Sequence, residues 1–92
     1  MTITIGSFTF DNVFYDAEVD VLYLHKGDPS SAVAFDESPE GHALRFDAAG
    51  SLVGVTIVGA KSLLDDTGEI KITVPEIVRV GSDAVAPALA GV

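Results

Sequence analysis

The residues in this chain best suited to chemistry are alternating carboxylates and two histidines. Asp16, Glu18 and Asp20 are spaced like the first ligands of a calcium-binding loop, which presents oxygen donors at alternate positions. Such a loop also needs glycine at its sixth position and a bidentate glutamate at its twelfth, where this chain has Val21 and Gly27. We therefore expect an acidic hairpin turn whose carboxylates accept hydrogen bonds from nearby backbone N–H groups.

The two histidines, His25 and His42, are the only imidazoles available for metal ligation or general-base catalysis. Asp20 or Asp47 would complete a donor set for a divalent cation, but no ligand spacing such as His-x-x-x-His accompanies them. We expect both histidines on the surface at strand ends. The alternative is a metal or small-ligand site near the hairpin turns. Its candidate residues are Asp16, Glu18, Asp20, His42 and Asp47.

Several other kinds of active site lack their characteristic residues. Without cysteine the chain has no disulfide, thiolate nucleophile or zinc–thiolate site. No serine lies in a Gly-x-Ser-x-Gly elbow, and Gly50, Gly54 and Gly59 lack the sequence context of a phosphate-binding loop. We therefore assign no catalytic residue and no cofactor, and favour a non-enzymatic protein over an enzyme.

The charge balance limits the classes of partner. The chain has 14 Asp and Glu residues against 5 Lys and Arg residues, a formal net charge of −9. Nucleic acid and anionic membranes are unsuitable partners because binding them takes clustered basic residues, whereas a basic protein is electrostatically favoured. No signal peptide and no apolar run of the roughly 18 residues that cross a bilayer is visible. We expect a soluble, cytoplasmic protein.

Strand-like patterns dominate the elements that must position these side chains. Apolar and polar residues alternate, or apolar runs are bounded by turn residues, as in antiparallel strands. The segments expected to be extended are 3–5, 8–10, 13–15, 20–26, 32–35, 42–47, 51–58 and 69–74. Pro75 interrupts the last of these, and residues 76–80 either resume extended structure or begin a docking segment. Val21 and Tyr23 lie opposite Leu22 and Leu24, so both faces of the 20–26 segment should be covered, as in a central strand or an inter-subunit surface.

The clearest turn is Asp47-Ala48-Ala49-Gly50. Asp at its first position favours a type I turn, and Gly at its fourth supplies a left-handed residue that leads into a bulged hairpin. Gly54, inside the following strand, predicts a bulge or an aromatic neighbour that crosses over it.

Two short helices are expected beside these strands. Residues 60–64 can form about one helical turn, opposed at its end by the charges of Asp65 and Asp66. Ser82 and Asp83 can cap a last helix up to residue 89. Because Pro87 lies inside that helix, we expect residues 82–92 to form a short helix or a frayed tail.

Two of these segments carry a recognisable pattern, Tyr-Asp-x-x-x-Asp-x-Leu-Tyr followed by Asp-x-x-Gly-x-x-Val-Gly-x-x-Ile. The first half lies at Tyr15–Tyr23 and the second at Asp47–Ile57. Over a stretch from Phe14 to Ala60, the chain thereby resembles a family of small bacterial proteins, domain-of-unknown-function family 2283 (DUF2283). Thr56 stands where that family usually has an acidic residue. The resemblance implies a compact antiparallel sheet with a short helix, and it implies no activity, since none is established for the family.

These observations predict a single small domain over residues 1–92, mainly β and at the margin α+β: a compact antiparallel β-meander sheet with one or two short helices. A hydrophobic fraction of 48% is high for a small monomer, so we expect a homodimer that buries sheet faces or pairs strand edges.

The function that size and charge favour is a non-enzymatic, homo-oligomeric interaction or regulatory module. Its most concrete version is antitoxin-like, with the acidic surface covering a basic partner. The alternative is a small enzyme or a metal- or ligand-binding protein that uses the carboxylates and histidine near the hairpin turns.

Overall fold

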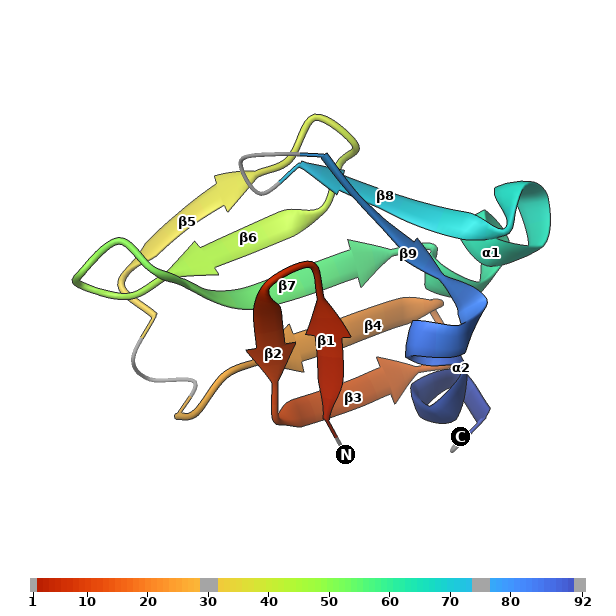
Figure 1. Cartoon of the computed structure of the whole chain (residues 1–92), viewed down its shortest axis with the longest axis horizontal. Coiled ribbons are helices and arrows are strands. Elements are labelled where there is room, and N and C mark those ends of the chain that lie inside the picture. Colours follow the sequence, from red (N-terminus) through yellow and green to blue (C-terminus); the bar gives the residue numbers. More distant parts are fainter. Residues whose placement is uncertain (1, 29–31, 74–76, 91–92) are drawn as a thin grey trace.

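One five-stranded antiparallel sheet organises the computed structural model, which describes residues 2–28, 32–73 and 77–90. In spatial order its strands are β3 (Asn12–Asp16), β4 (Val21–His25), β7 (Leu52–Val58), β6 (Ala43–Phe46) and β5 (Ala34–Glu37). The β3–β4 hairpin and the β5–β6–β7 unit each consist of consecutive strands, and the pairing of β4 with β7 joins them (Figure 1). The predicted mainly β, antiparallel fold is confirmed.

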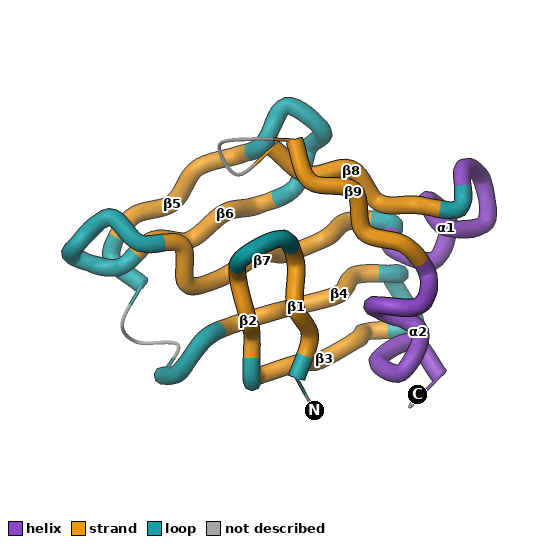
Figure 2. Tube along the Cα trace, viewed as in Figure 1, coloured by secondary structure: helices purple, strands orange, loops and turns teal. Residues whose placement is uncertain are grey.

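Two hairpins and two helices complete the described chain. Their bounds are β1 (Ile3–Ile5), β2 (Phe8–Phe10), α1 (Ala60–Thr67), β8 (Glu69–Thr73), β9 (Ile77–Gly81) and α2 (Ser82–Ala90). The β1–β2 hairpin crosses in front of the large sheet in Figure 2, and both helices lie toward one end of it. We call the side of the sheet that faces this hairpin the inner face and the opposite side the outer face.

The core forms where the inner face meets these covering elements. On the sheet, Leu22 pairs with Ile57 and Leu24 with Val55, and all four side chains are buried because alternate residues of a strand point to the same face. Buried residues from the hairpins and α2 pack against them in one cluster. They are Ile3, Ile5, Phe10, Ile70, Ile72, Val80, Val85 and Ala88.

Helix α1 is longer than the single turn expected from the sequence, since it includes Asp65 and Asp66 and ends at Thr67. Its C-terminus is closed by Gly68, which has a left-handed φ of 78° and donates its N–H to the Leu64 carbonyl at 2.8 Å. Its N-terminus is stabilised by a residue from another part of the chain, described below. These two caps outweigh the unfavourable acidic charges at the helix end.

Helix α2 runs from Ser82 to Ala90 with Pro87 inside it. Val85 and Ala88 lie in the core, so packing stabilises a helix that proline weakens. Residues 91–92 of the tail, like the Pro75 interruption, lie outside the described residues. Among the residues described, no helix is both long enough and apolar enough to cross a membrane.

The turn at Asp47 and the bulge after it are confirmed. Gly50 has a φ of 83° and donates its N–H to the Asp47 carbonyl at 3.0 Å. The β6–β7 register then shifts between Arg45 and Phe46, which is the signature of a bulge. The expected edge strand is also present as β5, displaced from residues 32–35 to residues 34–37.

Candidate functional site

Asp20 is the most highly connected carboxylate among the described residues, and it caps α1 from a distant part of the chain. Its side chain accepts hydrogen bonds from the backbone N–H groups of Lys61 at 2.8 Å and Ser62 at 3.0 Å, and from the Ser62 hydroxyl at 2.8 Å. Its carbonyl accepts further hydrogen bonds from the N–H groups of Gly59 and Ala60. Free N–H groups of a first helical turn are normally satisfied by the residue that precedes the helix. Here Asp20, at the β3–β4 turn, takes that role.

The Asp20 backbone is held in an uncommon conformation to do so. Its φ of 56° makes it the only non-glycine residue with positive φ among those described. Asp tolerates this left-handed region better than most residues, and the surrounding hydrogen bonds determine the conformation.

Tyr15 completes this cluster and shifts its electrostatics. The Tyr15 hydroxyl donates a hydrogen bond of 2.7 Å to Asp20 Oδ1. Burial acts to raise the pKa of Asp20, but the hydrogen bonds from Tyr15, Lys61 and Ser62 outweigh it and lower the pKa to about 2. The same hydrogen bond, together with burial and nearby carboxylates, raises the pKa of Tyr15 to about 12. Near neutral pH the cluster therefore consists of a neutral Tyr15 phenol and an ionised Asp20 carboxylate, and neither group changes its protonation state there.

The two other acidic residues of this turn do not join Asp20 around a common centre. Asp16 Oδ1 accepts the backbone N–H of Glu18 at 3.1 Å, a local turn contact of the predicted kind, while Glu18 is exposed. No group of three or more His, Cys, Asp or Glu side chains that could hold a metal ion occurs among the described residues.

His42 is buried, so the expectation of a surface histidine was wrong for this residue. It lies immediately before β6, and its Nδ1 accepts the Val58 N–H at 3.3 Å, while a second hydrogen bond joins the ring to the backbone of Lys71. Burial lowers the pKa of His42, although the Glu40 charge and the Lys71 contact act in the opposite direction. The ring thus connects β7 to β8, and both of its nitrogens are engaged in structural bonds.

Asp47 lies at the opposite end of β6 from His42. Its Oδ1 accepts the N–H groups of Ala49 at 3.0 Å and Ser51 at 2.9 Å, which shapes the hairpin turn. Asp47 follows His42 by five positions of extended chain, a span of roughly 17 Å. The structure therefore does not bring His42 and Asp47 together. Asp16 and Asp20 lie at the His42 end of the sheet, since Asp16 pairs with Val21 and Val21 with Val58.

His25 was also expected on the surface, and this prediction was wrong as well. Its side chain is only 8% exposed, and neither ring nitrogen has a hydrogen-bond partner. The cause is Gly54, which pairs with His25 across β4 and β7: a Cβ atom at Gly54 would lie 3.0 Å from His25 Cδ2 and 3.2 Å from Arg45 Cβ. The predicted aromatic neighbour over Gly54 is thus confirmed and is the His25 ring. The strand register, which the sequence does not state, was needed to identify it.

The outer face of the sheet carries several apolar side chains that are open to solvent. Phe14 is 61% exposed, Tyr23 39%, Phe35 69% and Val58 54%, so no described segment covers them. The Phe14 and Tyr23 rings stack with centroids 5.9 Å apart, and Arg45 Cζ lies 5.6 Å from the centroid of Phe35. The predicted central position of β4 is confirmed, since it pairs with both β3 and β7, but on its outer face only His25 is buried and Tyr23 is exposed.

A family model described as "Protein of unknown function (DUF2283)" matches residues 12–61, more than half of the 92 residues. No curated protein and no solved structure matches the chain. The matched segment contains the whole large sheet and the start of α1. Within it, Tyr15 and Asp20 secure the helix, Asp47 shapes the turn, and Gly54 accommodates His25. In this chain these residues of the pattern therefore have structural roles.

Proposed function

The chain belongs to the DUF2283 family of proteins of unknown function, and we propose that it acts as a non-enzymatic, homodimeric interaction module whose contact surface is the outer face of the sheet. The observation that carries this proposal is the exposure of Phe14, Tyr23, Phe35 and Val58 on one continuous face. Exposed apolar patches of this kind mark interaction sites in soluble proteins. Aromatic residues and arginine are also the types enriched where binding energy concentrates.

The four side chains belong to neighbouring strands. Phe14 on β3 pairs with Tyr23 on β4, and Tyr23 pairs with Thr56 on β7, two residues before Val58. Phe35 on the edge strand β5 pairs with Arg45 on β6. Hence exposed apolar side chains lie on the outer face of β3, β4, β5 and β7, and a flat partner surface such as another sheet would contact them together.

A second copy of the chain is the occupant that we propose for this face. Two-fold packing requires a surface that complements itself. Arg45 and Glu37 lie on the same face of adjacent strands, by the alternation of β5 and β6. A two-fold axis in the plane of the interface, midway between them, would bring each Arg45 to the partner copy's Glu37. The same axis would bring the Phe14–Tyr23 half of each face together.

The expected strength of the dimer is moderate. Burying a large apolar side chain contributes about 1.5–3 kcal/mol, and part of each of these four is already covered. Association costs several kcal/mol of lost translational and rotational freedom. A dissociation constant in the micromolar range follows, so the dimer must be sought at protein concentrations above that range.

Light scattering coupled to size-exclusion chromatography, over a range of concentrations, tests the proposal. The wild-type chain should have the mass of a dimer at high concentration, and F14S/F35S the mass of a monomer. V19S is the matched control, because Val19 is 59% exposed but lies in the β3–β4 turn, away from the outer face. If F14S/F35S were as dimeric as the wild type, the outer face would not be the contact surface.

Charge variants test the arrangement of the two copies. R45E should weaken the dimer, and R45E/E37R should restore it by exchanging the two ends of each intermolecular ion pair. A wild-type monomer at every concentration would contradict the homodimer. In that case the alternative is a regulatory module that binds a basic protein on the same face. Such a partner should bind the wild-type chain and should lose binding to F14S/F35S.

A further inference from the structure

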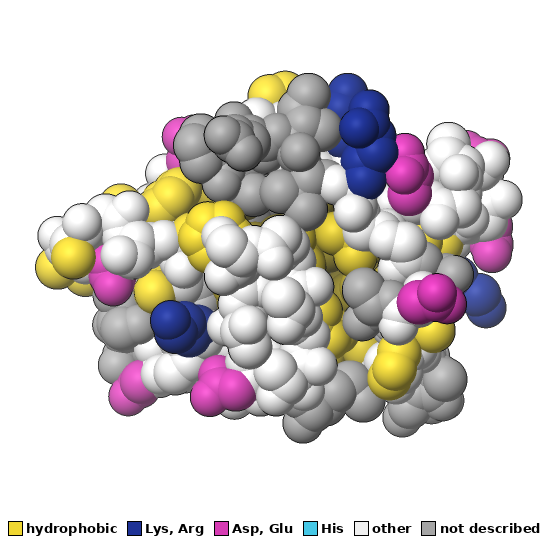
Figure 3. Space-filling model, in the orientation of Figure 1, with side chains coloured by type: hydrophobic (Ala, Val, Ile, Leu, Met, Phe, Trp, Pro, Cys, Tyr) yellow, Lys and Arg dark blue, Asp and Glu magenta, His cyan; other side chains and the backbone are white. Residues whose placement is uncertain are grey.

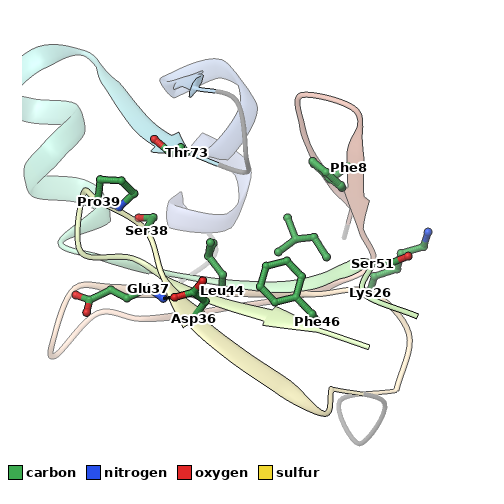
Figure 4. A pocket seen from close by; sticks show the side chains of 12 residues that line it. Phe8, Lys26, Asp36, Glu37, Ser38, Pro39, Leu44, Phe46, Ser51 and Thr73 are labelled. Carbon is green, nitrogen blue, oxygen red and sulfur yellow. Dashed lines mark hydrogen bonds between the residues drawn. The ribbon is translucent and has the colours of Figure 1, made fainter. Parts of the chain in front are cut away.

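A pocket with a volume of about 730 Å³ lies on the inner face of the sheet, and of its lining residues only Glu37 is also used in the proposed dimer contact. It is bordered by β5 and β6, by Phe8 of the β1–β2 hairpin and by Thr73 at the end of β8 (Figure 4). Pockets of about 300–1,000 Å³ are typical of sites for small organic molecules. Figure 3 shows hydrophobic side chains at the surface beside the hairpin, over β5 and β6.

The base of the pocket is apolar and partly aromatic. Leu44 and Leu52 are buried side chains of the core, whereas Phe46 and Phe8 are only partly buried and so retain free ring surface. In Figure 4, Phe8 and Phe46 approach the pocket from the hairpin and from the sheet, respectively. A flat or branched apolar group would remove this surface from water, which stabilises the bound state.

Asp36 is the carboxylate that shares the inner face with the apolar base of the pocket. Asp36 pairs with Leu44 across β5 and β6 and so shares the inner face with it. Its Oδ1 accepts the N–H of Glu37 at 2.8 Å, and the single ion pair between described residues, Arg79–Glu69, lies elsewhere. Arg45, the cation on the adjacent strand, is directed to the outer face over Phe35. Asp36 therefore has no cationic partner among the described residues.

Two neutral polar groups of the pocket are already engaged. The Thr73 hydroxyl donates a hydrogen bond of 2.7 Å to Glu40, and the Ser38 hydroxyl oxygen accepts the His42 N–H at 3.1 Å. Glu37 and Lys26 also line the pocket, and Lys26 follows β4, which is three strands away from Asp36 in the sheet order. The carboxylates of the pocket therefore outnumber its cations, and Asp36 is the one that faces its apolar base.

We propose that this pocket binds an organic cation, with its apolar body on Phe8, Phe46 and Leu52 and its ammonium group at Asp36. The overall charge of −9 favours a cation over an anion at any site on the molecule, and aromatic rings stabilise ammonium groups beside them. The proposal does not depend on the dimer, because it uses the opposite face of the sheet.

Nuclear magnetic resonance titration of ¹⁵N-labelled chain with phenethylammonium tests this proposal, with 3-phenylpropionate as an anion of similar size. Phenethylammonium should shift the amide signals of residues around the pocket in a saturable manner with millimolar affinity, and 3-phenylpropionate should bind more weakly. D36N should lower the phenethylammonium affinity by about fivefold while the anion is unaffected or improved.

E18Q is the matched control, since it removes one negative charge at the β3–β4 turn and should change the affinity less than D36N. Urea denaturation of both variants checks that each is folded. Three outcomes would overturn the proposal: no saturable shifts, equal affinity for the cation and the anion, or equal losses in D36N and E18Q.

Discussion

The Tyr15 hydroxyl donates its hydrogen bond to the carboxylate that caps α1, so a single pair of residues links the β3–β4 hairpin to the helix that follows β7. Asp20 and Lys61 are 41 residues apart in the sequence. This contact secures the hairpin and the helix at the same end of the sheet. Four experimental predictions concern this cluster and the two buried histidines.

Removing the Asp20 side chain should destabilise the protein through loss of the helix cap. D20A should lower the free energy of unfolding by about 2–3 kcal/mol, because it deletes a cap and leaves Ala in a left-handed conformation. Y15F should lower it by about 1 kcal/mol, since it removes one hydrogen bond and leaves the cap in place. Urea unfolding of both variants and of Y15F/D20A gives the coupling energy. Strictly additive effects would contradict a direct Tyr15–Asp20 interaction.

The Asp20 cluster should also make stability dependent on acid pH. The pKa of Asp20 is lowered from 3.8 to about 2 in the folded state. A carboxyl group with a lowered pKa contributes stability above its unfolded pKa and loses it as the pH falls through its folded pKa. Wild-type stability should therefore decline between about pH 4 and pH 2, and D20N should show a shallower decline across the same interval. Thermal unfolding at several pH values measures both slopes, and parallel curves would contradict this assignment.

Substituting Gly54 should strain the sheet at its centre. In G54A the new Cβ would lie 3.0 Å from His25 and 3.2 Å from Arg45, so we expect a loss of about 1–3 kcal/mol. G81A is the matched control: Gly81 is also a strand glycine, and a Cβ there would have nothing within 4 Å. G54A/H25A should recover part of the loss because the closest contact is removed. Equal stabilities for G54A and G81A would contradict the close packing of His25 on Gly54.

Protonation of His42 should weaken the fold below neutral pH. Burial lowers the pKa of His42, and its Nδ1 must stay unprotonated to accept the Val58 N–H. For a lowered histidine pKa, the stabilising contribution is present above the unfolded value of 6.5 and is lost as the pH falls through the folded value. The urea midpoint of the wild type should drop more between about pH 7 and pH 5 than that of H42Q. Glu40, the nearest charged group acting on His42, opposes but does not reverse the shift.

Much of the fold could be predicted because its signals are local. The alternation of Ile70, Ile72 and Val74 with polar residues indicates a strand whatever its partners are. Asp47 and Gly50 likewise predict their turn, since the hydrogen bonds that form it join residues at most four positions apart. The family pattern implied no activity, and of its positions Asp47 and Gly50 form this local turn.

The candidate site was harder to predict because its contacts are not local. Asp20 was identified as a turn residue that satisfies backbone donors, but the donors are in α1 rather than in its own turn. His25 and His42 were predicted to lie on the surface because each stands at an end of an expected strand. Burial of His25 depends on a glycine in the neighbouring strand, and that of His42 on hydrogen bonds to β7 and to Lys71.

By itself, the sequence determined the strands, the turns, the acidic charge and the absence of thiol chemistry, because each of these depends on residue type or on residues a few positions apart. Only the tertiary structure decided which face of the sheet is covered, which distant carboxylate caps α1, and that Asp36 faces an apolar pocket. Strand order and register set these relationships. A shift of one residue in register would exchange the inner and outer faces of a strand, and the stability that selects one register comes from packing across the whole core.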